Sequence, residues 1–137
     1  MKKLLVLTAF ILFSGFAFSQ TLQKGNFIGF HVLDIHLNPD VTLNQVQEFT
    51  MNKLIPEWEK QFGMKVYSIK GIRGENKYRY GMIYAYESVA ARDKFWNDDG
   101  SLTELGNSAM EKMQPIMEEF TNKFGEFTYK YTDWVVQ

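Results

Sequence analysis

Apolar and polar residues alternate along four segments of the chain, whereas along three others the apolar residues recur every three or four positions. Alternation is typical of half-buried strands, and the three-to-four spacing is typical of amphipathic helices. The expected strands are residues 27–37, 64–72, 78–87 and 127–136. The expected helices are residues 43–62, 89–96 and 102–124. The predicted order is therefore β-α-β-β-α-β, with a short extra helix after the third strand.

Several helix boundaries are marked by residues with specific local roles. Thr42 and Ser101 each begin a capping-box sequence, in which a hydroxyl and a side chain three residues later satisfy free backbone N–H groups. Gly63 is expected to end the first helix, because glycine readily adopts the left-handed conformation common at that position. Pro56 has no backbone N–H to donate, so a kink or a new helix start is expected near Leu54.

This order of elements is that of a ferredoxin-like α+β fold, in which two halves interleave into one four-stranded antiparallel sheet. Both helices then cover the same face of the sheet, and the other face has no cover from its own chain. Aromatic residues make up 16% of the sequence, which fits a large core, an interface or the lining of an apolar cavity. A second copy would cover the bare face, so a homodimer is expected.

Residues 1–19 have the pattern of a secretory signal peptide, with Lys2 and Lys3 ahead of an apolar run and small residues before Gln20. The alternative is a membrane anchor, which needs about 20 apolar residues and therefore a longer run than this one. We expect cleavage before Gln20 and export to the periplasm or the medium. We also expect a single domain over residues 20–137 and no membrane association after cleavage.

The exported chain carries a small negative net charge. Loss of Lys2 and Lys3 reduces the 15 basic residues to 13 against 16 acidic ones, which gives a net charge of −3. The sequence contains no basic stripe of the kind that nucleic-acid binding requires. Nucleic acid is therefore not expected as a partner.

Two stretches resemble a known group of proteins. "FHVLDIHL", residues 30–37, resembles the opening strand of stress-responsive A/B-barrel domains, in which a histidine precedes alternating aliphatic residues. "IYAYESVAARDKFWNDDG", residues 83–100, is similar to the NIPSNAP-type pattern of an aromatic strand, Tyr-x-Ser and an Ala-Ala-Arg helix. Both groups belong to the dimeric α+β-barrel superfamily. The resemblance implies a dimer whose sheets meet face to face. It implies no single chemistry, because relatives include cofactor-free oxygenases, polyketide cyclases, haem-handling enzymes and proteins with no known activity.

The two histidines, His31 and His36, lie in one expected strand. Side chains alternate between the faces of a strand, so His31 shares one face with Leu33 and His36 shares the other with Asp34. A zinc site needs three or four ligands, and the chain has two histidines and no cysteine. We therefore expect no metal site, and we expect His36 and Asp34 to be exposed or to meet a partner.

His31 is the candidate catalytic residue. The resemblance to A/B-barrel domains implies that this position faces a pocket between sheet and helices, where some cyclase relatives place a general base. A neutral imidazole can accept a proton near pH 7. Cyclase-like relatives carry a second histidine after the third strand, whereas residues 95–99 contain none, which counts against an acid–base pair. The alternative is a core histidine bonded to a neighbouring hydroxyl.

Tyrosines alternate along the third expected strand, and the resemblance implies that their face lines the pocket. Buried phenols need hydrogen-bond partners, so such a pocket suits a flat, partly polar ligand. The alternative is a tyrosine-rich core or dimer interface. The predicted ligand-binding residues either line this pocket or close it from the helices. They are His31, Leu33, Trp58, Tyr80, Tyr84 and Trp96.

The predicted function is the binding of a small apolar or aromatic ligand, without a cofactor and without firm evidence of catalysis. Two alternatives stay open. One is a cofactor-free oxygenase or cyclase-like enzyme that uses His31 as general base. The other is a structural or interaction dimer, in which the aromatic residues only build the interface.

Overall fold

The computed structural model describes residues 21–137. The predicted signal peptide, residues 1–19, and the predicted cleavage site before Gln20 lie outside the described residues. Within residues 21–137, no helix is long and apolar enough to cross a membrane.

In this part of the chain, four strands form one antiparallel sheet in the order β2-β3-β1-β4. The strands are β1 (Phe27–Leu37), β2 (Lys65–Lys70), β3 (Tyr80–Tyr86) and β4 (Gly125–Val135). β1 is a central strand and pairs with β4 over its full length, from Phe27 opposite Val135 to Leu37 opposite Gly125. The sheet confirms the predicted α+β class and is compatible with a ferredoxin-like fold.

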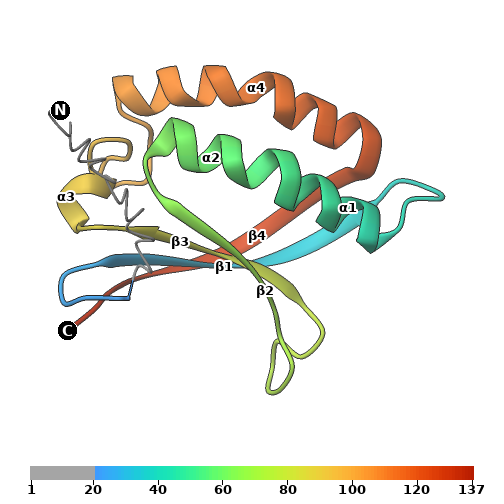
Figure 1. Cartoon of the computed structure of the whole chain (residues 1–137), viewed down its shortest axis with the longest axis horizontal. Helices are drawn as coiled ribbons and strands as arrows, with labels where there is room; N and C mark the ends of the chain where they lie inside the picture. Colours follow the sequence, from blue (N-terminus) through green and yellow to red (C-terminus); the bar gives the residue numbers. More distant parts are fainter. Residues whose placement is uncertain (1–20) are drawn as a thin grey trace, which may run out of the picture.

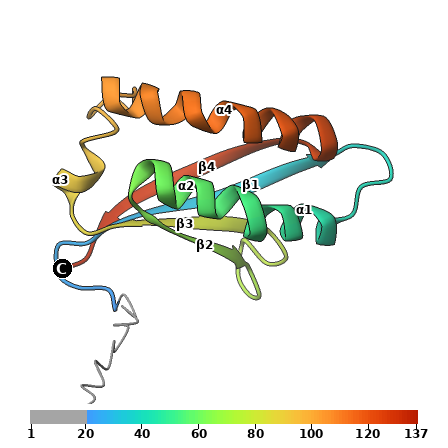
Figure 2. The same ribbon diagram turned by 45° about the horizontal axis from the view of Figure 1, so that its top comes forward.

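The longer helices all lie on the same side of this sheet, as Figures 1 and 2 show. The helical elements are α1 (Leu43–Phe49), the π-helix η1 (Thr50–Leu54), α2 (Ile55–Phe62), α3 (Val89–Arg92) and α4 (Glu104–Phe124). α3 is shorter than the predicted helix over residues 89–96 and lies at one end of the sheet (Figure 1). The prediction that the main helices cover one face is confirmed.

Pro56 follows a short π-helix, and no sharp kink interrupts the first helix there. The N–H of Ile55 donates to the carbonyl of Thr50, a spacing of five residues that makes η1 a π-helix. This wider turn comes just before the proline, which lacks the N–H of a normal helical bond. As a result, α1, η1 and α2 run on as one continuous rod in Figure 1.

The helix caps confirm one predicted capping box and correct the other. Thr42 accepts a hydrogen bond from the Gln45 N–H, and the Gln45 side chain accepts from the Thr42 N–H, as predicted. The second box was wrong, because the N-cap of α4 is Thr103 rather than Ser101. The Ser101 hydroxyl donates to Asp99 instead, at 2.6 Å, while Thr103 accepts from the Gly106 N–H at 3.1 Å.

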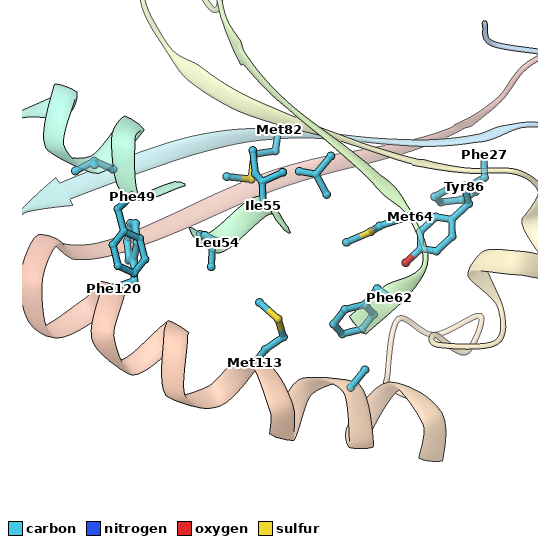
Figure 3. Packing of buried hydrophobic residues seen from close by; sticks show 13 residues of the cluster. Phe27, Phe49, Leu54, Ile55, Phe62, Met64, Met82, Tyr86, Met113 and Phe120 are labelled. Atoms are coloured by element: carbon cyan, nitrogen blue, oxygen red, sulfur yellow. The ribbon is translucent and has the colours of Figure 1, made fainter. Parts of the chain in front are cut away.

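The core lies between the sheet and the helices. Phe62, Leu54 and Met113 are its largest fully buried side chains. Figure 3 shows Met113 pointing from α4 toward the α2 side of the core, with Phe27 and Tyr86 entering from the sheet. We call the sheet face that carries Phe27 and Tyr86 the helix-facing side.

The opposite face of the sheet, here called the uncovered face, is also apolar. Ile28, Phe30 and Val32 alternate with the helix-facing residues of β1 and are only partly buried. Trp134, opposite Ile28 on β4, is 61% exposed. No helix of the described residues lies across this face in Figure 2.

Candidate functional site

His31 lies at the centre of a group of aromatic rings on the helix-facing side. The Tyr84 ring meets the imidazole edge-on, with ring centroids 4.6 Å apart. The Tyr129 ring lies at 5.0 Å and the Tyr131 ring at 5.3 Å, the latter stacked. We call these four residues the tyrosine cluster.

Strand register brings this cluster together. His31 in β1 is opposite Met82 in β3 and opposite Tyr131 in β4. Tyr84 and Tyr129 are two positions away from those partners, so all four rings project from the same side of the sheet. Three strands that are distant in sequence therefore contribute to one site.

His36 and Asp34 lie on the other side, as the alternation of β1 predicts. Both are exposed, and Asp34 accepts a hydrogen bond from Arg79 at 2.9 Å on the uncovered face. The two histidines therefore do not share a site. His31 is the one that faces the helices.

Burial decides the protonation state of the cluster. It lowers the pKa of His31 to about 4, and it raises the pKa of Tyr84, with nearby Tyr129 as a smaller cause in the same direction. At pH 7 the imidazole is therefore neutral and the Tyr84 phenol keeps its proton. General bases work best with a pKa near the working pH, so an imidazole with a pKa of about 4 is better suited to binding than to proton abstraction.

Two rings of the cluster are open to solvent. Tyr129 is 54% exposed and Tyr131 is 56% exposed, although both project from the helix-facing side. β4 is an edge strand of the sheet, so its side chains have a neighbouring strand on one side only. Neither tyrosine was predicted as a site residue. The available signal was the alternation Phe127-Tyr129-Tyr131, which places these rings on one face of the last strand.

Leu33 and Tyr80 lie farther along the sheet. Leu33 is opposite Tyr80 on one side and Tyr129 on the other, so it borders the cluster. Both residues also line an apolar cavity of about 40 Å³ beneath α1 and η1, whose wall includes Thr50 and Phe120. A cavity of this size holds little more than water, since a benzene-sized site measures roughly 150 Å³.

Trp58 and Trp96, both predicted as ligand-binding residues, lie in different parts of the structure. The Trp58 ring lies 6.1 Å from the Tyr84 ring and 4.8 Å from Phe62, so it joins the cluster to the core. Trp96 stacks on Phe62 at 4.9 Å and lies 6.1 Å from Tyr86. The structure thus gathers His31, Tyr84 and Trp58 in one region, with Leu33 at its border, and places Trp96 against the core.

Comparison with known proteins found no family model that matches this chain and no curated protein that matches it.

Proposed function

We propose that this protein binds a small, uncharged, planar aromatic ligand at the tyrosine cluster. The observation that carries the proposal is the neutral, partly buried His31 with three tyrosine rings within 5.3 Å, two of them more than half exposed. Exposed aromatic rings held together on a rigid sheet offer stacking surfaces to a flat ligand.

The energetics of the cluster favour such a ligand. Aromatic pairs contribute about 0.5–1.5 kcal/mol each beyond the area they bury, so two or three ring contacts suffice for weak but specific binding. Burial keeps His31 and Tyr84 uncharged, so they favour an uncharged partner. Because Tyr129 and Tyr131 are open to solvent, the ligand does not need the 40 Å³ cavity near Tyr80.

A titration of residues 20–137 with naphthalene and simple quinones would test this proposal. Trp58, 6.1 Å from Tyr84, serves as a fluorescent reporter beside the cluster. We expect saturable quenching that Tyr129→Ala and Tyr131→Ala weaken several-fold. Tyr67→Ala is the matched control, because Tyr67 is 46% exposed on β2 and projects from the uncovered face. If no ligand of the panel quenches the fluorescence, the proposal is rejected.

We also propose that the protein forms a homodimer of the dimeric α+β-barrel type, in which two uncovered faces meet. The supporting observation is the run of partly buried apolar residues on that face, Ile28, Phe30 and Val32, beside the exposed Trp134. Exposed apolar patches of this kind are typical of interaction surfaces. Sedimentation of residues 20–137 tests this assembly, and a monomer at all concentrations would contradict it.

Export is the third element of the proposal. Lys2, Lys3 and the apolar run that follows support removal of residues 1–19 during secretion. Expression of the whole chain in a bacterial host and mass measurement of the periplasmic product would show a new amino terminus at Gln20. A product that keeps Met1 would contradict export by cleavage.

A further inference from the structure

The loop between β2 and β3, residues 71–79, carries the two most exposed large hydrophobic side chains of the described residues. Ile72 is 74% exposed and Tyr78 is 69% exposed. In Figure 1 the loop extends beyond the ends of both strands and away from the helices. The two side chains therefore add nothing to the core, and their exposure needs another explanation.

Tyr78 holds its ring in solvent at a cost in backbone energy. Its φ of 69° lies in the left-handed region, which few residues other than glycine, asparagine and aspartate adopt. The Tyr78 N–H donates to the Gly71 carbonyl, and the Gly71 N–H donates to the Arg79 carbonyl, both at 2.8 Å. These bonds fix Tyr78 beside Gly71 and therefore close to Ile72. Backbone strain of this kind is concentrated at functional sites, and here burial of the ring does not offset it.

Three exposed basic residues accompany this apolar pair, and none of them forms an ion pair within the described part of the chain. They are Lys70, Arg73 and Lys77. The Lys77 Nζ lies 4.7 Å from the centre of the Tyr78 ring. Glu75 is the one acidic residue of the loop, and Arg79 is paired with Asp34. The loop is thus a positive site on a chain whose net charge is negative.

We propose that residues 71–79 form a membrane-docking loop, which inserts Ile72 and Tyr78 into the surface of a bilayer with anionic headgroups. Tyrosine rings favour the headgroup level of a bilayer, and basic side chains beside them are attracted to anionic lipids. Ile72 reaches the boundary of the acyl chains, while the three cations stay among the phosphates. This inference is independent of the ligand site. It differs from the expectation of no membrane association, which was drawn without the shape of this loop.

The size and charge of the loop favour a lipid surface over a protein partner. A stable protein interface buries about 800 Å² on each partner, which is far more than two side chains at the tip of a loop supply. The centres of protein interfaces are also depleted of lysine. A bilayer surface makes neither demand, because it accepts a few apolar side chains and attracts the cations around them.

Partitioning of residues 20–137 onto lipid vesicles tests this proposal. Residues 1–19 are left out because their apolar run would itself bind membranes. The vesicles contain either phosphatidylcholine alone or equal parts of phosphatidylcholine and phosphatidylglycerol, and co-sedimentation at low ionic strength measures the bound fraction. We expect binding to the anionic vesicles that is at least about tenfold stronger than binding to the neutral ones, since each basic side chain near the surface contributes about fivefold.

Two double variants separate the apolar from the charged contribution. Ile72→Ser with Tyr78→Asn removes both apolar side chains, and asparagine tolerates the left-handed conformation at position 78. This variant is expected to weaken binding to anionic vesicles at least about tenfold. Arg73→Gln with Lys77→Gln is expected to weaken it by a similar factor, about tenfold or more, and to make it insensitive to salt.

Matched controls change the same kinds of residue outside the loop. Leu105→Ser alters a leucine that is 52% exposed on α4. Lys94→Gln with Lys112→Gln removes two exposed charges, one after α3 and one on α4. Both controls are expected to keep vesicle binding within about twofold, because attraction to the headgroups falls off within a Debye length.

Three outcomes would overturn the membrane-docking loop. The first is equal binding to neutral and anionic vesicles, and the second is full binding by both loop variants. The third is binding to the soluble polyanion dextran sulfate without binding to anionic vesicles, which would assign the loop to an acidic macromolecule. None of these outcomes touches the aromatic ligand site, whose own test uses the tyrosine cluster.

Discussion

The Tyr84 ring covers the edge of the His31 imidazole, with centroids 4.6 Å apart and ring planes at 72°. This contact joins β3 to β1 at the middle of the sheet and keeps water from one side of the imidazole. Because a charged imidazole is poorly solvated there, the folded protein favours the neutral ring, and the pKa of His31 falls to about 4.

The low pKa of His31 predicts a specific loss of stability in acid. In the unfolded chain the imidazole has its ordinary pKa of about 6.5, so it takes up a proton before the folded protein does. The stabilisation is therefore complete above pH 6.5 and is lost as the pH falls toward 4. Between pH 7 and 4.5 the wild type is expected to lose about 1–2 kcal/mol more unfolding free energy than His31→Gln, after allowance for partial solvent access.

Urea unfolding at several pH values measures this difference. His36→Gln is the control, since His36 is exposed on the uncovered face of the same strand. Equal acid losses in the wild type and His31→Gln would show that burial of His31 does not govern its titration.

Much of the fold was predictable because its signals are local. Alternation predicted β1 with its observed bounds, and Thr42 and Gly63 cap helices through neighbours within four residues, as predicted. β3 was predicted to begin at residue 78, but Tyr78 has φ of 69° and belongs to a loop in which its N–H donates to Gly71. The pattern of side chains in the sequence did not predict the positive φ of Tyr78.

The site was only half predictable, for a physical reason. Alternation separated the face of His31 from that of His36, and the resemblance implied that His31 and the face carrying Tyr84 look toward the helices. Tyr129 and Tyr131 join them through the pairing of β1 with β4, two strands about 100 residues apart in sequence. That register depends on how the whole sheet assembles, and a one-residue slip would have placed the same tyrosines on the uncovered face.

A second prediction concerns Gly106, which lies in the first turn of α4. In an exposed helix, glycine to alanine would stabilise by about 1 kcal/mol. At Gly106, however, a Cβ would clash with the Phe95 carbonyl oxygen and lie 2.9 Å from Leu102 Cδ2. Overpacking costs about 1–3 kcal/mol, so Gly106→Ala is expected to be destabilising in urea unfolding. A more stable Gly106→Ala protein would contradict the close contact between α4 and residues 95–102.

Two methionines in different surroundings give a third prediction. Met113 is fully buried between α4 and the sheet, whereas Met51 is 49% exposed. Met113→Ala is expected to cost about 2–5 kcal/mol of unfolding free energy, because it removes buried atoms and leaves a cavity. Met51→Ala is expected to change it by less than about 1 kcal/mol. Similar losses for both would show that the core does not centre on Met113.

The dimer proposal yields the last prediction. Trp134 is 61% exposed, so its removal is expected to leave the monomer's fold intact. It lies opposite Ile28 on the uncovered face, and tryptophans at the centre of an interface often carry much of the binding energy. Trp134→Ala is therefore expected to weaken association at least about tenfold in sedimentation experiments, equivalent to about 1.4 kcal/mol.

Tyr131→Ala is the matched control for this experiment, because Tyr131 is 56% exposed on the helix-facing side of the same strand. Removal of its ring is expected to weaken ligand binding and to leave sedimentation unchanged. If Tyr131→Ala also dissociates the dimer, the two copies meet along the β4 edge rather than across the uncovered face. The pair of variants thus assigns one face of β4 to the ligand and the other to the second copy.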